Sequence, residues 1–199
     1  METDLPLLSA AKRMDKDALV KIFDLYASPL YNYALRLCGD PLLADQIVGD
    51  VFARLLDQLA AGKGPTSNLR SYLYETAYHM VVDERRASLR KAPLEALPAL
   101  RQDMGSGSLH PEDRIMFEMV VDAIQCELTD DQRHVIILRF LEGFSLRETA
   151  AILGKEVNHI KVIQTRAIAK LRNAFESRER RAAVSLPRVE KRSTALGIQ

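Results

Sequence analysis

A short helical pattern and a longer one, separated by a glycine turn, lie in the C-terminal part of the chain and constrain its fold most strongly. Residues 129–175 read TDDQRHVIILRFLEGFSLRETAAILGKEVNHIKVIQTRAIAKLRNAF. Ser145 and Glu148 have the spacing of a capping box, so a short helix is expected to begin there. Gly154 can supply a left-handed turn, and a longer basic helix is expected from about Val157. Two helices joined in this way form a helix-turn-helix, whose second helix enters the major groove of DNA.

Small and apolar residues inside this unit support the interpretation. Ala150 lies where the two helices would approach most closely, and Leu153 and Ile160 are expected to close the core between them. Lys155 departs from the pattern, because the residue after the turn glycine is usually apolar. A helical hairpin that binds only protein remains the alternative, since patterns of this length also recur by chance.

The N-terminal half is predicted to be helical as well. Apolar residues with three-and-four spacing indicate a helix over 15–38, which Pro29 is expected to divide into two. Asp40 followed by Pro41 predicts the start of the next helix, which should end near Leu59.

A break and one further helix complete this half. The segment AAGKGPTSN holds two glycines and a proline, after which Ser67 or Asn68 is expected to cap a helix over 69–91. Four helices are thus expected to form a first domain over residues 1–90.

The rest of the chain divides into a linker, a second domain and a tail. Residues 91–111 hold three prolines and a Gly-Ser-Gly, which predicts a flexible linker. The second domain is expected over 112–178, beginning with a helix from Pro111 to about Cys126. A capping box is expected at Thr129 and Gln132, and the core residues of the helix that follows should be Val135, Ile136, Leu138, Phe140 and Leu141.

No sustained period is found in residues 179–199, so a disordered basic tail is expected there. Contact of this tail with upstream DNA or with a protein partner is the alternative.

Charge is distributed in blocks, although the net charge is only +1. Residues 1–84 and 102–159 have an excess of acidic side chains, whereas residues 85–101 and 160–199 have an excess of Lys and Arg. Each basic block lies at or after the end of a predicted long helix, where a phosphate backbone could bind. The acidic surfaces are expected to face a protein partner.

Composition excludes several classes of function. No apolar run approaches the roughly 20 residues of a membrane span, and the N-terminus shows no export pattern, so we expect a cytoplasmic protein without membrane insertion. Cys38 and Cys126 lack the spacing of a metal site. The histidines are scattered singly, and no phosphate loop or nucleophile constellation is present. We therefore expect no catalysis, metal, cofactor or small-molecule substrate.

Together the two halves resemble the extracytoplasmic-function sigma factors, the small two-domain initiation subunits of bacterial RNA polymerase. Similarity to the family's second region lies in LYNYALRLCGDPLLADQIVGDVFARLL and in LRSYLYETAYHMVVDERR, which ends in an Asp-x-x-Arg pattern at Asp83 and Arg86. Similarity to its fourth region lies in LTDDQRHVIILRFLEGFSLRETAAILG. The resemblance covers about residues 15–176, and the absence of a folded third domain between the two halves is typical of this subgroup.

This resemblance implies an all-α fold of two small helical domains, the second a helix-turn-helix, with core RNA polymerase and promoter DNA as partners. The polymerase would contribute the clamp of its largest subunit and its flap. A solvated acidic face is the alternative for the residues expected to dock on the clamp, which are Asp45, Gln46, Asp50 and Arg54.

By the same resemblance, the helix over 69–91 would meet the −10 promoter element and help to open it. Aromatic side chains could stack with unpaired bases while basic ones hold single-strand phosphates. Core packing is the alternative for the tyrosines, and Glu75 departs from a basic tendency in the family. The residues expected to act here are Arg70, Tyr72, Tyr74, Tyr78, His79, Arg85, Arg86 and Arg90.

The second domain would read the −35 promoter element. Its expected contacts are Asn158, His159, Lys161, Val162, Thr165, Arg166, Lys170 and Arg172. Val162, Ile163 and Gln164 depart from the family pattern, and Ile163 is expected to take over the core position. Val162 is expected to contact thymine methyl groups or an inhibitory partner, with a slightly apolar exposed face as the alternative.

The resemblance predicts a subunit that directs polymerase to promoters and helps to melt them. A stand-alone helix-turn-helix regulator is the alternative, but it leaves the first domain without a task. Members of the family are commonly held inactive by an anti-sigma factor wedged between the domains, and the predicted linker leaves room for such a partner.

Overall fold

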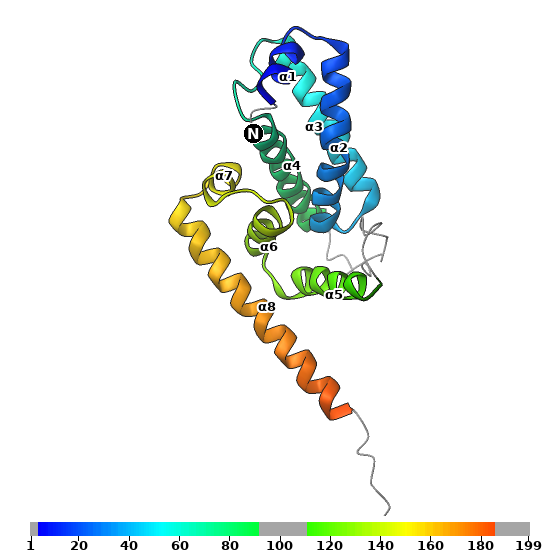
Figure 1. Ribbon diagram of the computed structural model, residues 1–199, viewed down its shortest axis with the longest axis vertical. Coiled ribbons are helices and arrows are strands. Elements are labelled where there is room, and N and C mark those ends of the chain that lie inside the picture. The colour runs from blue at the N-terminus through cyan, green and yellow to red at the C-terminus, as the bar shows by residue number, and fades with distance from the viewer. Residues whose placement is uncertain (1–3, 92–110, 186–199) are drawn as a thin grey trace, which may run out of the picture.

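The computed structural model describes residues 4–91 and 111–185, and every element within these ranges is helical (Figure 1). The expected all-α fold is therefore confirmed for this part of the chain. The predicted linker falls almost wholly outside the described residues, at 92–110. No helix in the described ranges is both long enough and apolar enough to cross a membrane.

The first domain packs four helices around one core. Residues Ile22 and Tyr33 of the second helix, Val51 of the third and Leu73 of the fourth are buried together. A first short helix that the sequence did not predict adds Leu8 to this core. The four helices are α1 (Asp4–Ala11), α2 (Lys16–Cys38), α3 (Pro41–Ala60) and α4 (Leu69–Lys91).

Pro29 does not divide α2, contrary to the sequence prediction. Tyr26 before the proline and Leu30 after it are buried in the same core, so a continuous helix keeps both in place. The carbonyl of Leu25, which loses its intrahelical donor to the proline, belongs to a residue that is exposed and can be hydrated. Burial on both sides of Pro29 therefore outweighs the lost hydrogen bond.

Local capping signals set the helix starts as predicted. Asp40 Oδ1 accepts hydrogen bonds from the backbone N–H groups of Leu42 and Leu43, with Pro41 at the first helical position. Asn68 Oδ1 accepts from Ser71 N–H at 3.1 Å, which identifies Asn68 as the cap of α4.

The second domain begins with α5 and ends with a helix that projects from the body of the molecule (Figure 1). The predicted hydrogen bond from Thr129 N–H to Gln132 Oε1 forms at 3.2 Å. The elements are α5 (Pro111–Glu127), α6 (Asp130–Ile136), a π turn η1 (Ile137–Leu141), α7 (Leu146–Ile152) and α8 (Val157–Ser185).

The π turn changes which side chains enter the second core. Val135, Ile136 and Leu138 are buried as the sequence predicted, but Phe140 is 54% exposed. Ile137, which was not predicted in the core, is fully buried. A π turn closes hydrogen bonds one residue further back than an α-helix, as Glu142 N–H does with Ile137 O at 2.9 Å. The wider turn rotates Phe140 outward.

Helix α8 is longer than predicted. It continues through residues 179–185, which were expected to belong to a disordered tail. Exposed ion pairing between Arg180 and Glu176, one turn apart, supports this extension. The remainder of the predicted tail, residues 186–199, lies outside the described residues.

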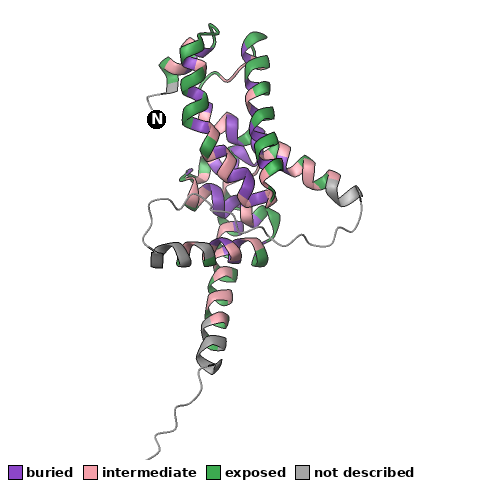
Figure 2. Ribbon diagram, turned by 90° about the vertical axis from the view of Figure 1, so that its right-hand side faces the viewer, coloured by how far each residue is buried: buried purple, intermediate pink, exposed green. Residues whose placement is uncertain are grey.

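The two domains pack against each other. Helix α4 contacts α7, and α2 contacts both α5 and α6. Buried residues of both domains form one continuous core, seen as the central buried region in Figure 2. Tyr33 and Tyr74 from the first domain and His134 and Phe144 from the second meet at its centre. The structure therefore shows a closed arrangement of the two domains.

Candidate nucleic-acid interface

The helix-turn-helix forms as the sequence predicts. Ser145 Oγ accepts a hydrogen bond from Glu148 N–H at 3.2 Å, and Glu148 Oε2 accepts one from Ser145 N–H at 2.8 Å. Gly154 has a φ of 60°, in the left-handed region, and Lys155 N–H donates to Ala150 O across the turn. Ile160 is buried where α8 packs on α6 and α7, so the opposite face of α8 remains open.

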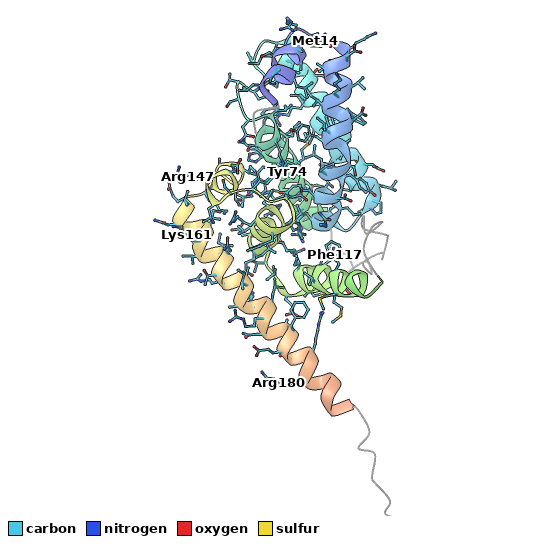
Figure 3. The ribbon with its side chains drawn as sticks, in the orientation of Figure 1. Met14, Tyr74, Phe117, Arg147, Lys161 and Arg180 are labelled. Atoms are coloured by element: carbon cyan, nitrogen blue, oxygen red, sulfur yellow. The ribbon has the colours of Figure 1, made fainter. Side chains whose placement is uncertain are left out.

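Every residue of α8 that was predicted to contact DNA is exposed to solvent. Lys161 projects outward from the edge of the second domain in Figure 3. No neighbouring element covers this face in the described structure, so it is available to a groove of DNA. The exposed residues are Asn158, His159, Lys161, Val162, Thr165, Arg166, Lys170 and Arg172.

The unusual Val162-Ile163-Gln164 sequence has a structural explanation. Ile163 is buried, as predicted, and Val162 is 46% exposed. Gln164 Oε1 accepts a hydrogen bond from Arg139 Nε at 3.1 Å, and the same guanidinium donates to the Phe144 carbonyl. Arg139 therefore ties α8 to the turn before α7, and Gln164 is engaged there rather than on the outer face.

Sequence reasoning missed two basic residues of this domain. Arg139 was treated only as part of a helix, because its partner Gln164 lies 25 residues further along the chain. Arg147 is exposed on α7 and projects from the same edge of the molecule as Lys161 in Figure 3. Its place in the first turn of the helix-turn-helix could have indicated a phosphate contact.

Helix α4 presents only some of its predicted −10 residues to solvent. His79 and Arg86 are exposed and Tyr72 is partly buried. The side chain of Arg90 lies outside the described residues. The remaining four predicted residues all contact the second domain: Arg70, Tyr74, Tyr78 and Arg85.

Glu142, directly after the π turn, receives two of these contacts and a third from Arg36 of α2. Tyr74 is fully buried, and its hydroxyl donates to Glu142 Oε2 at 2.5 Å, while Arg70 donates to the Glu142 backbone carbonyl. Arg36 Nη1 lies 3.1 Å from Glu142 Oε1, with side-chain exposures of 12% and 8%. Burial and the Glu142 carboxylate raise the pKa of Tyr74, so its hydroxyl stays protonated and can donate. We call Glu142 with Arg36, Arg70 and Tyr74 the Glu142 latch.

Aromatic rings fill the space around the latch. The Arg70 guanidinium lies 4.0 Å from the centroid of the Phe144 ring, and Tyr74 packs edge-on against Phe144 at 4.9 Å. Arg36 also lies 5.9 Å from the ring of Phe117, which Figure 3 shows on α5. These contacts hold both arginines on the surface of the second domain.

A second cluster joins the domains through His134. Tyr33 Oη lies 3.0 Å from His134 Nδ1, and the Tyr78 ring packs edge-on against the imidazole at 4.8 Å. Burial lowers the pKa of His134 to about 4, and nearby Asp130 only partly opposes this. The ring is therefore neutral at physiological pH. Close by, Arg85 forms an ion pair with Asp130.

The predicted clamp-docking residues lie on the solvent face of α3. Its other face buries apolar residues against α2 and α4, Val51 and Leu55 among them. Gly49 lies within the exposed face, and a Cβ added there would meet no atom within 4 Å outside its chain neighbours and the nearby helix backbone. The residues on this open face are Asp45, Gln46, Asp50 and Arg54, all exposed.

Comparison with known proteins matches one family model in each half of the chain. The family model for Sigma-70 region 2 matches residues 22–91, and that for Sigma-70, region 4 matches residues 126–173. Both matches follow the order expected from the sequence.

Curated relatives include three bacterial sigma factors. RNA polymerase sigma-E factor of Streptomyces avermitilis is 30% identical over 75% of this chain and 80% of its own length. ECF RNA polymerase sigma factor SigX of Bacillus subtilis is 28% identical over 78% of this chain and 82% of SigX. ECF RNA polymerase sigma factor BldN of Streptomyces coelicolor is 26% identical over 84% of this chain, which spans 64% of BldN.

Two solved structures share the fold. CnrH, in complex with the cytosolic domain of CnrY, aligns with a TM-score of 0.66 and 21% identity, over 87% of this chain and 97% of CnrH. The sigma factor RpoE of Bartonella quintana, in complex with the anti-sigma factor NepR, aligns with a TM-score of 0.63 and 23% identity, over 78% of this chain and 95% of RpoE.

The fold and its open recognition helix define a two-domain helix-turn-helix protein of the sigma-70 type. The chain belongs to the extracytoplasmic-function (ECF) sigma factors, as its two region matches and its curated relatives show.

The buried His134 predicts a pH dependence of stability. In the unfolded chain its pKa returns to its ordinary value of 6.5, whereas burial holds it at about 4 in the fold. Between pH 6.5 and about pH 4 the unfolded chain therefore binds more protons than the folded chain. The contribution of His134 to stability is complete above pH 6.5 and is lost as the pH falls toward 4. We expect this group to cost about 2 kcal/mol of unfolding free energy between about pH 7.5 and pH 5.

Urea unfolding at several pH values measures this dependence. His134→Gln should show a shallower loss on acidification than the native chain. His159→Gln, which changes an exposed histidine of α8, should keep the native slope. Parallel pH profiles for the native chain and His134→Gln would contradict the assignment.

Proposed function

We propose that this chain binds core RNA polymerase, directs it to promoters and helps to open the −10 region. The observation that carries the proposal is the presence of regions 2 and 4 in order on one chain, with the α8 groove face and the α3 face both exposed. A stand-alone helix-turn-helix regulator is not favoured, because it gives the region 2 match no role. A polymerase subunit of this kind acts in the cytoplasm.

Helix α8 would lie in the major groove of the −35 element. Asn158 and Arg166 can pair with base edges, where a bidentate contact discriminates by about 1 to 3 kcal/mol. Lys161 and, on α7, Arg147 lie where they can hold the flanking phosphates. Val162 offers a methyl surface to thymine within the same exposed face.

Opening of the −10 region would be driven by binding free energy alone. Tyr72 and Tyr78 offer aromatic faces to unpaired bases, and Arg86 and Arg90 can bind the phosphates of the separated strand. Strand separation is favoured when these groups bind single strands better than the duplex. No bond is made or broken by the chain itself.

A protein inhibitor is the second proposed partner. CnrH and RpoE, which share this fold, were both solved with a protein bound: the cytosolic domain of CnrY and the anti-sigma factor NepR. We infer that this chain is also controlled by an anti-sigma factor.

Transcription from a library of promoter fragments tests the function. Purified chain is added to core polymerase, and transcripts are sequenced. Promoter-selective transcripts that require the chain are expected. DNA binding of equal strength and selectivity with and without polymerase would instead identify a free-standing regulator.

Lys161→Ala should weaken promoter binding by the holoenzyme and reduce its salt dependence, because a phosphate contact releases counterions on binding. The slope of log affinity against log salt is expected to fall by about one. Binding is measured by fluorescence anisotropy at several salt concentrations. Lys21→Ala, which removes an exposed lysine from α2, should leave both quantities unchanged. An unchanged slope in Lys161→Ala would remove the phosphate contact.

Asp50→Lys should weaken binding to core polymerase by about tenfold or more, because it reverses a charge in the proposed clamp contact. Asp24→Lys makes the same change at an exposed position of α2, outside the proposed docking face, and serves as the matched control. Affinity is measured by titrating labelled chain with core enzyme, and circular dichroism checks the fold. Equal affinities for Asp50→Lys and the control would rule out docking through this face.

A further inference from the structure

The second domain covers side chains of α4 that promoter opening requires. Tyr74 is fully buried under Phe144 and Glu142, and the ring of Tyr78 is packed on His134. In the closed arrangement Tyr74 has no free face for a base, and Tyr78 is partly buried. The faces of α4 that remain open carry Tyr72, His79 and Arg86, so only part of the proposed strand-binding surface can be reached.

The contacts pair cations of the first domain with carboxylate and carbonyl oxygens of the second. Arg36 meets the Glu142 carboxylate, Arg70 donates to the Glu142 carbonyl, and Arg85 pairs with Asp130. These oxygens occupy the guanidinium groups that single-strand phosphates would need. Second-domain oxygens and DNA phosphates therefore compete for Arg70 and Arg85.

Burial decides which of these contacts matters most. The Arg36–Glu142 pair is largely buried, and removing one partner of such a pair leaves an uncompensated charge out of water. Arg85 and Asp130 have side-chain exposures of 34% and 56%, where solvent screens their attraction. Glu142 is therefore the principal anion of the interface.

The backbone around Glu142 is specialised for this contact. Glu142 follows the π turn, an arrangement that is rare in proteins and is frequently found at functional positions. Gly143 then has a φ of 73°, which reverses the chain so that Phe144 packs beneath Arg70 and Tyr74. Glu142 thus presents its carboxylate and its backbone carbonyl to the first domain, and Phe144 presents its aromatic ring.

From these contacts we infer that the Glu142 latch holds the free chain closed, with the second domain occupying the −10 strand-binding face of α4 in place of DNA. This inference rests on the proposed role of α4 in promoter opening. Release of the latch must precede full engagement of the −10 strand. The apparent affinity of the free chain for single-stranded DNA is then reduced by the fraction of molecules that are open.

Glu142→Gln in the full-length chain tests the latch, since it keeps the size of the side chain and removes its charge. The matched control is Glu127→Gln, an exposed carboxylate of the same domain. Small-angle scattering reports the radius of gyration, and amide hydrogen exchange reports the protection of α4 and α6. Glu142→Gln should be more expanded than the native chain and should exchange faster at both helices, whereas the control should match the native chain.

Binding of a fluorescein-labelled single strand of about 15 nucleotides of mixed sequence, without polymerase, tests the competition. Glu142→Gln is expected to bind about tenfold more tightly than the native chain, with the control unchanged. Expansion without a gain in affinity would overturn the occupation of the strand-binding face, and a chain that stays compact would overturn the latch itself.

Arg36→Gln opens the latch from the side of the first domain. It decides the question if circular dichroism shows that Glu142→Gln is unfolded. It should expand the chain and raise single-strand affinity in the same direction. Failure of the native chain to direct transcription would refute the proposed function, while scattering and exchange would still decide whether the latch exists. The two proposals can therefore fail separately.

Discussion

A buried carboxylate holds the two domains of this chain in register. The oxygens of Glu142 are shared between Arg36 of α2 and Tyr74 of α4, and its backbone carbonyl binds Arg70. A carboxylate in such a position is tolerated only when its charge is matched and its lone pairs are occupied. Because its partners come from two helices of the first domain, the requirement to satisfy Glu142 fixes how the second domain sits on them.

The surfaces needed for the proposed function differ in how accessible they are. The outer faces of α8 and α3 are open, so contact with the −35 element and with polymerase needs no rearrangement. The face of α4 around Tyr74 is closed. The first two contacts could therefore form before the third, which would order promoter recognition ahead of strand opening.

Sequence reasoning succeeded where the signal was local. The capping residues Asp40 and Ser145 mark helix starts, because their side chains bond to amides two or three residues away. The exposed face of α8 followed from its periodicity in the same way. The family resemblance added the order of the two regions, which the matches confirm.

It failed where a distant part of the chain decides the outcome. Pro29 was expected to break α2, but burial on both sides of it keeps the helix continuous. The interdomain contact of Tyr74 could not be foreseen, because its partner Glu142 lies 68 residues away. The π turn has no pattern in the sequence that marks it, so the outward rotation of Phe140 could not be foreseen. Contacts with the second domain decide which side chains of α4 are buried, and the sequence of α4 alone does not reveal these contacts.

The clustering of tyrosines also gives the protein an intrinsic optical signal. The chain has no tryptophan and six tyrosines, and Tyr33, Tyr74 and Tyr78 all lie at the contact between the domains. Tyrosines fixed in an asymmetric environment give near-ultraviolet circular dichroism that disappears when their packing is lost. Domain separation can therefore be followed in real time on the unlabelled chain, before polymerase is added.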